Sequence, residues 1–222
     1  MPGAAMDDAT CSQIFETLAA TYPDACDPEP FFSSPFQVLV LTILSAQTTD
    51  AQVWSLQGSL FGAYPSPGAL ADADLGELEA IVRPTGYYHA KARHLIGAAR
   101  MLVAEYGGEV PARMEDLVRL PGVGRKTANI VLYHAFGLNE GVAVDTHVLR
   151  LAHRIGLSDR RDPAGVERDL MTCLPRPMWG PVTDLMIAHG RAICTARRPR
   201  CEVCPIREQC RFFHEARRPV SG

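Results

Sequence analysis

Apolar residues recur along most of the 222-residue chain at the spacing of one helix face. In residues 11–22, for example, Ile14, Phe15 and Leu18 fall on one side of a helix. The sequence contains no sustained alternation of apolar and polar residues, which is the pattern of strands. We therefore predict an all-α fold. The predicted helices span residues 11–22, 35–46, 51–61, 75–82, 90–105, 113–119, 125–136, 145–156, 163–173 and 178–193.

The composition is that of a globular protein, with 47% apolar and 21% charged residues. The length allows one domain with a large core or two smaller domains. The most apolar run, residues 38–44, is far too short to span a bilayer. The N-terminus lacks the basic and apolar regions of a secretory signal. We expect a soluble cytoplasmic protein with no membrane partner.

The net charge of −3 hides a strong asymmetry along the chain. Residues 1–110 carry four Lys and Arg against 13 Asp and Glu, a net charge of −9. Residues 111–222 carry 18 against 12, a net charge of +6. Such a division is compatible with a polyanion-binding surface on the basic half, although a chance distribution of solvated charges explains it equally well.

Four of the seven cysteines follow the pattern C-x6-C-x2-C-x5-C. Clustered thiols in an intracellular chain bind metals more often than they pair as disulfides. Zinc sites usually have two short C-x2-C knuckles, whereas irregular loops also suit an iron–sulfur cluster. The spacing thus leaves disulfides, zinc and iron–sulfur open. The candidate ligands are Cys194, Cys201, Cys204 and Cys210, and the scattered Cys11, Cys26 and Cys173 are expected to be buried small apolar residues.

A loop with two glycines separates the predicted helices 113–119 and 125–136. Gly122 and Gly124 allow a tight turn around Val123 that exposes successive backbone N–H groups. These groups and the positive end of the next helix can bind phosphate oxygens. The loop lacks P-loop spacing and a preceding strand, which disfavours a nucleotide site. It is typical of a helix-hairpin-helix, which binds the DNA backbone without reading its sequence.

Lys126 lies in the first turn of the helix after this loop and is one of only two lysines among 22 basic residues. The positive helix end and partial burial would both favour its free amine, the form that a Schiff-base nucleophile requires. A simple phosphate contact is the alternative. Asp145 precedes an amphipathic helix and is expected to cap it, while its carboxylate remains available to stabilise positive charge at a sugar carbon.

Several motifs in different parts of the chain carry a resemblance to a known family. They are LSAQTTD at 44–50, LPGVGRKTAN at 120–129, VAVDTHV at 142–148, HGRAIC at 189–194, and the four-cysteine loop. Together they resemble the endonuclease III family of DNA glycosylases, and the match is collinear over nearly the whole chain.

The resemblance implies a two-domain fold with DNA bound in a cleft between the domains. One is a six-helix domain, residues 28–138, that contains the hairpin. The other is discontinuous, residues 1–27 and 139–222, and holds a [4Fe–4S] cluster on the four clustered cysteines. The cluster would be structural rather than catalytic.

The resemblance also implies a chemistry, in which Lys126 is the nucleophile and Asp145 the essential aspartate. The expected partner is double-stranded DNA with damaged bases or abasic sites, and the expected lesions are oxidised pyrimidines, flipped out of the duplex. Attack of Lys126 at the sugar C1′ and β-elimination would make the enzyme both a glycosylase and an abasic-site lyase. It is expected to act as a monomer, associated with the nucleoid if its source is bacterial.

Further DNA contacts follow from the same resemblance. Gln47 corresponds to a residue that fills the gap left by the flipped base, although it can also be a polar residue at a helix end. Tyr87 stands where relatives often have a leucine wedge, which leaves the opposite-base preference open. The hairpin carbonyls are a candidate site for a monovalent cation. The other expected DNA-binding residues are Lys91, Gly122, Val123, Gly124, Arg125, Thr127 and His147. Lys91 can equally be a solvated lysine, and His147 a buried histidine with satisfied hydrogen bonds.

Two other functions remain possible from the sequence. A related glycosylase for mismatched or otherwise damaged bases would share the hairpin; the adenine-mismatch branch normally lacks the lysine and has a large additional C-terminal domain. A non-catalytic helix-hairpin-helix protein would bind DNA without forming a covalent adduct.

Overall fold

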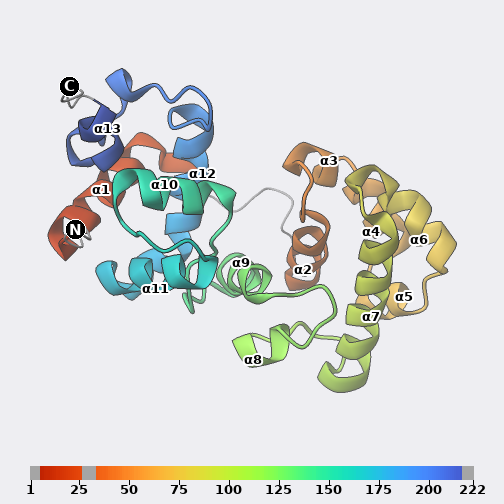
Figure 1. Ribbon diagram of the computed structural model, residues 1–222. Coiled ribbons are helices and arrows are strands. Elements are labelled where there is room, and N and C mark those ends of the chain that lie inside the picture. Colours follow the sequence, from red (N-terminus) through yellow and green to blue (C-terminus); the bar gives the residue numbers. More distant parts are fainter. Residues whose placement is uncertain (1–5, 27–33, 217–222) are drawn as a thin grey trace. The chain divides into compact units, whose positions relative to one another are not determined.

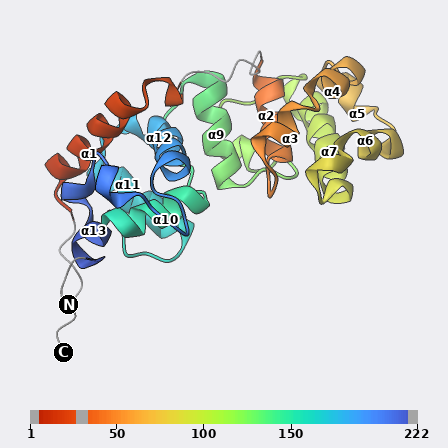
Figure 2. The same cartoon turned by 90° about the horizontal axis from the view of Figure 1, so that it is seen from above.

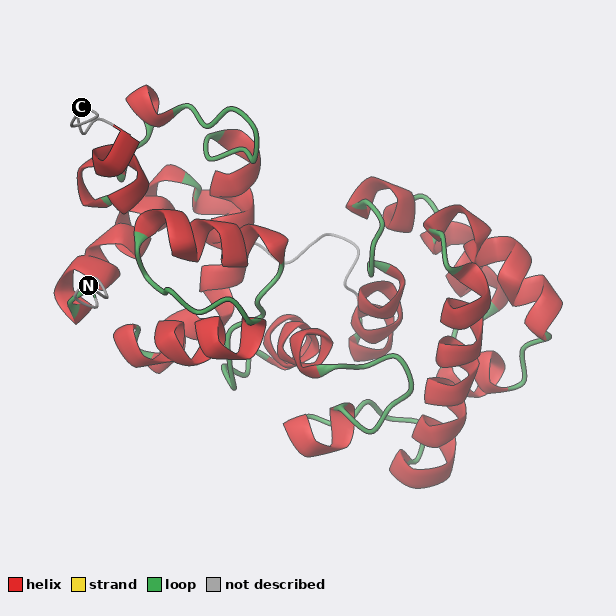
Figure 3. Cartoon of the chain, viewed as in Figure 1, coloured by secondary structure: helices red, strands yellow, loops and turns green. Residues whose placement is uncertain are grey.

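A computed structural model describes residues 6–26 and 34–216 of the chain. Within these residues the regular structure is helical, with no strand, which confirms the predicted all-α class (Figure 3). No helix in the described part of the chain combines the length and the apolar character needed to cross a membrane. The chain divides into two compact units, and each is described separately.

The first unit to consider comprises residues 28–138. Its core is built on α2 (Pro35–Leu44), in which every residue from Val38 to Leu44 is buried. This helix packs against α7 (Tyr88–Tyr106) and α9 (Arg125–Phe136). Such burial on all sides is why residues 38–44 are apolar without periodicity. The remaining helices are α3 (Asp50–Trp54), α4 (Gln57–Ala63), α5 (Pro67–Ala71), α6 (Leu75–Val82) and α8 (Met114–Leu117) (Figure 1).

The second unit joins the two ends of the chain, residues 1–27 and 139–222. Its centre is α12 (Trp179–Ala192), which packs against α1 (Asp8–Thr21) and α10 (Thr146–Ile155). The other helices are α11 (Pro163–Cys173) and α13 (Arg211–Ala216). Both α11 and α12 lie beside α1 (Figures 1 and 2), so the N-terminal helix completes a core made mostly of C-terminal residues.

The bounds of α6, α9 and α11 agree with the prediction to the residue, but the predicted helix 51–61 is wrong. It is divided into α3 and α4, which are separated by Ser55 and Leu56. The Ser55 hydroxyl donates a hydrogen bond to the Gln52 carbonyl at 2.8 Å, and Leu56 N–H bonds three residues back, to Val53. This local bonding replaces the continuous helical ladder. The prediction also missed α5, which Pro67 starts behind the Ser66 cap, and α13.

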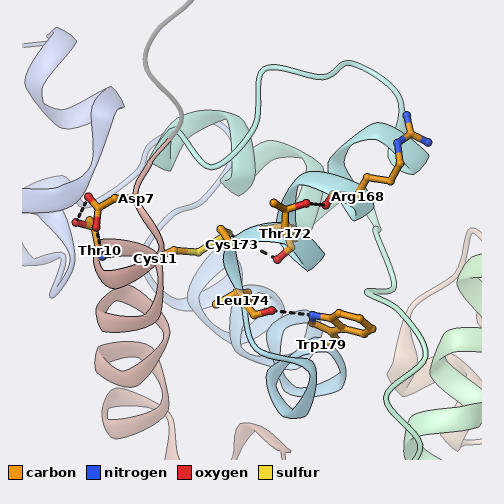
Figure 4. The surroundings of a disulfide bond; sticks show 9 residues. Asp7, Thr10, Cys11, Arg168, Thr172, Cys173, Leu174 and Trp179 are labelled. Atoms are coloured by element: carbon orange, nitrogen blue, oxygen red, sulfur yellow. Dashed lines mark hydrogen bonds between the residues drawn. A yellow bond between two sulfur atoms is a disulfide. The ribbon is translucent and has the colours of Figure 1, made fainter.

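The scattered cysteines are only partly as expected. Cys11 and Cys173 are buried, but they are joined by a disulfide that links α1 to the end of α11 (Figure 4). Cys26 is half-buried, and its thiol donates a long hydrogen bond to the Pro181 carbonyl at 3.9 Å. No local pattern predicted this pairing, because the disulfide joins residues 162 positions apart.

Candidate active site and metal centre

The hairpin before α9 requires glycine at its first position. Gly122 has a φ of +82°, and a Cβ there would lie 2.9 Å from the Cβ of His94. Val123 is buried and anchors the turn, with its N–H donating to the Leu120 carbonyl at 3.0 Å. A side chain at 122 would be excluded by both backbone conformation and space.

The residues that follow the turn, at the start of α9, are largely exposed. Gly124, Arg125 and Lys126 are exposed, and Thr127 is half-buried. Gly124 is the N-cap and supplies no side chain to bond the first-turn N–H groups. These donors, together with the positive end of the helix, form an arrangement that binds an anionic oxygen.

The two lysines of the chain have opposite environments. The side chain of Lys126 is exposed at the start of α9, contrary to the expected partial burial. Lys91 is only 4% exposed, and its ammonium donates to the Thr85 carbonyl at 2.8 Å. Burial lowers the pKa of Lys91. The expected phosphate contact of Lys91 is therefore corrected: its ammonium is turned inward and fixes the segment before α7.

That segment carries Tyr87, which is 70% exposed and has a φ of +48°. Gln47, also exposed, has a φ of +54°. Among the described residues, these are the only non-glycine positions with positive φ. Left-handed backbone is unfavourable for such residues, and it concentrates at functional sites. The 3-10 helix Arg83–Thr85 that leads to Tyr87 packs against α3, which begins shortly after Gln47.

Asp145 in the other unit caps α10, as expected. One carboxylate oxygen accepts hydrogen bonds from the N–H groups of His147 and Val148, both at 2.8 Å. The second oxygen lies 3.2 Å from Nδ1 of His147. The imidazole is half-buried against Gly190, where an added Cβ would lie 2.8 Å from its Cδ2. His147 therefore orients the Asp145 carboxylate, and this contact was not predicted.

The four clustered cysteines form a group of free thiols in the same unit. The Cys204 thiol lies close enough to the other three thiols for their charges to interact. Burial raises the pKa of the Cys204 thiol to about 11 and also raises the pKa of Cys201 and Cys210. Within the described residues, no three His, Cys, Asp or Glu side chains form a site for a single metal ion.

This donor set fits an iron–sulfur cluster, which is held by four thiolates. Iron bound by these residues would supply the positive charge that the buried thiolates otherwise lack. Arg154 adds a cationic donor, since its Nη1 lies 3.4 Å from the Sγ of Cys194. Its guanidinium is in turn held by the carbonyls of Thr195 and Ala196, both at 2.8 Å.

Comparison with known proteins decides the family. The sequence model of the HhH-GPD superfamily base excision DNA repair protein matches residues 40–176, and that of the iron-sulfur binding domain of endonuclease III matches residues 194–210. Endonuclease III of Synechocystis sp. is 48% identical over 200 residues, covering 90% of both chains. This chain belongs to the endonuclease III family. Endonuclease III of Thermotoga maritima is 41% identical over 82% of this chain and 84% of the relative.

Solved structures of endonuclease III share the fold of this chain. A trapped endonuclease III–DNA covalent intermediate is 36% identical, with a TM-score of 0.87 over 95% of this chain and 99% of that one. A non-covalent endonuclease III–DNA complex gives the same identity and TM-score, over 96% and 100%. A thermostable thymine-DNA glycosylase, 23% identical with a TM-score of 0.83, is similar in fold.

Membership of the endonuclease III family establishes the general function. The protein is a DNA glycosylase and abasic-site lyase of base excision repair, it binds DNA, and it carries an iron–sulfur cluster. The expected iron–sulfur cluster is thereby confirmed, in preference to zinc or disulfides.

Proposed function

We propose that this endonuclease III homologue excises oxidised pyrimidines through a Schiff base on Lys126. The observation that carries the proposal is the contrast between the two lysines. Lys91 is buried and its ammonium is bonded to Thr85, whereas Lys126 is exposed at the hairpin. The covalent DNA intermediate trapped for an endonuclease III supports a covalent mechanism.

The reaction follows from the chemistry of a primary amine. Deprotonated Lys126 Nζ attacks C1′ of the damaged nucleotide, the C1′–N bond breaks, and the base leaves with the bonding electrons and takes up a proton. Ring opening gives an imine between Nζ and C1′. Loss of a proton from C2′ then expels the 3′ phosphate, which cleaves the strand by β-elimination. Hydrolysis of the imine releases Lys126.

Asp145 is proposed to stabilise positive charge on the sugar or to assist proton transfer. Its hydrogen bonds to His147 and Val148 hold the carboxylate in one orientation, which supports such a role. His147 itself is proposed to contact the DNA near the lesion, as expected from the resemblance.

The remaining contacts belong to unit 28–138. The hairpin residues Gly122–Thr127 are proposed to bind a phosphate through backbone N–H groups, and their carbonyls to hold a monovalent cation. Gln47 is proposed to fill the gap left by the flipped nucleotide, and Tyr87 to stack on the orphaned base. Their left-handed backbones and exposure support both roles.

The cluster is proposed to be [4Fe–4S], bound by Cys194, Cys201, Cys204 and Cys210, and to stabilise unit 1–27 and 139–222. The hairpin unit would then supply the nucleophile. The enzyme is proposed to act as a monomer on damaged double-stranded DNA in the cytoplasm, associated with the nucleoid if its source is bacterial.

A panel of duplexes tests the substrate class. Each duplex contains one oxidised pyrimidine, an oxidised guanine, an adenine mismatch or a preformed abasic site. We expect base release and strand cleavage with oxidised pyrimidines and cleavage at the abasic site. Excision of mismatched adenine or oxidised guanine in preference to every oxidised pyrimidine would refute the proposed substrate class without refuting the lyase chemistry.

A further inference from the structure

A buried histidine joins the N-terminal helix to the cysteine cluster. His189, on α12, is 1% exposed, and both of its ring nitrogens have partners. Nδ1 lies 2.9 Å from the hydroxyl of Tyr22, the C-cap residue of α1. Nε2 lies 3.6 Å from the Sγ of Cys204. The Tyr22 and His189 rings also meet edge to face, with centroids 5.8 Å apart.

The direction of these two hydrogen bonds follows from the chemistry of the sulfur. A thiolate that ligates iron can only accept, so Nε2 of His189 must carry the proton that points at Cys204. Nδ1 is then the acceptor, and the Tyr22 hydroxyl donates to it.

Donors aimed at cluster thiolates have a known electronic effect. They withdraw charge from sulfur and favour the more negatively charged reduced cluster, which raises the reduction potential. The Tyr22 hydroxyl fixes the tautomer and the orientation of the imidazole, just as an outer hydrogen bond fixes a metal-bound histidine. We therefore expect the effect of Tyr22 on the cluster to pass through His189.

We propose that Tyr22 and His189 form a hydrogen-bond relay to Cys204 that raises the reduction potential of the iron–sulfur cluster, with Tyr22 acting as a positioning residue. The inference rests on the cluster ligands assigned under the proposed function. It gives the N-terminal helix a role in tuning the cluster, beyond completing the core of its unit.

The decisive variant is Tyr22→Phe, which keeps the ring and removes only the hydroxyl. Holoenzyme of the wild type and the variant is compared by iron content and by voltammetry of the cluster. We expect equal iron content and a more negative potential for Tyr22→Phe. The matched control is Tyr106→Phe in the other unit, which removes a hydroxyl that donates to Asp116 at 3.2 Å and should leave the potential unchanged.

A second variant tests transmission through the imidazole. In His189→Gln the amide N–H can still donate to sulfur. Because an amide has only one donor nitrogen, a hydrogen bond from Tyr22 no longer determines which nitrogen carries the proton. Adding Tyr22→Phe to this variant should produce no further shift, whereas independent effects would add. An unchanged potential in iron-replete Tyr22→Phe overturns the relay while leaving the cluster intact. Wild-type protein that binds no iron overturns both the cluster assignment and the relay.

Discussion

Gly122 has left-handed backbone, and an added Cβ would clash with the side chain of His94. Substitution by alanine therefore tests how the hairpin depends on glycine. Gly107, the αL residue after α7, has a similar φ of +62°, but a Cβ there would meet nothing within 4 Å. The pair therefore separates backbone strain from steric conflict.

We predict that Gly107→Ala costs about 1 kcal/mol from φ strain alone. Gly122→Ala should cost about 1–3 kcal/mol more because His94 or the hairpin must move. It should also weaken binding to undamaged duplex DNA, which Gly107→Ala should not. Urea unfolding and fluorescence anisotropy measure the two effects, and equal costs for both variants would contradict the steric account.

Asp145 has two functions in this account, helix cap and catalytic carboxylate. Asp162 provides a matched control, since it caps α11 in the same unit by accepting from Gly165 N–H at 2.8 Å. Asparagine caps helices about as well as aspartate. Replacing either aspartate by asparagine therefore removes the carboxylate charge while keeping the helix cap.

We predict that Asp145→Asn slows excision of an oxidised pyrimidine by about 10²-fold or more, with stability nearly unchanged. Asp162→Asn should retain wild-type excision. Single-turnover base release and thermal unfolding are the measurements. Equal activity of the two variants would show that the Asp145 carboxylate has no catalytic role.

At the scale of elements, the sequence predicted the helices whose ends have explicit signals. The helix α11 begins at Pro163 behind the Asp162 cap, and α9 ends just before its cap Gly137, which has a φ of +66°. The sequence did not reveal the break at Ser55 or the inward turn of Lys91, because both depend on hydrogen bonds to specific carbonyls. A lysine that is exposed and a lysine that is buried look identical in a helical pattern.

Two hydrogen bonds to specific carbonyls hold the turn before α7. Thr85 is buried, and its hydroxyl donates to the Val82 carbonyl at 2.8 Å, while its own carbonyl accepts from Lys91. These two bonds hold the turn that presents Tyr87. Lys91→Met keeps the apolar stem but leaves the Thr85 carbonyl without this donor.

We predict that Lys91→Met accelerates amide hydrogen exchange in residues 83–91 and weakens DNA binding without changing its salt dependence. A lysine that contacts phosphate directly would reduce the slope of log K against log salt by about 1 when removed. Arg125→Met, at the exposed start of α9, should reduce the slope in this way. A reduced slope for Lys91→Met would show that Lys91 contacts a phosphate directly after all.

At the scale of the whole molecule, local motifs predicted more than long-range pairs. The hairpin and the four-cysteine loop are each contiguous, so their composition and spacing were informative. The Cys11–Cys173 disulfide and the Tyr22–His189 contact join distant parts of the chain, and no local pattern indicates either. The basic half of the chain contains the hairpin and most of unit 1–27 and 139–222.

The disulfide closes a loop of most of the chain and should stabilise the folded state by restricting the unfolded one. We predict that Cys11→Ala with Cys173→Ala lowers the thermal midpoint, as expected for a loss of about 2–4 kcal/mol. Cys26→Ala should change it little. Wild-type protein that alkylates at Cys11 and Cys173 when denatured without reductant would show that no disulfide is present.

Borohydride trapping shows whether Lys126 is the nucleophile. The enzyme is incubated with a duplex that contains an oxidised pyrimidine or an abasic site, the imine is reduced, and the linked peptide is identified by mass spectrometry. We predict a stable adduct on Lys126, absent from Lys126→Ala and still formed by Lys91→Met. The absence of an adduct with the wild-type enzyme, or an adduct on another amine, would contradict the account.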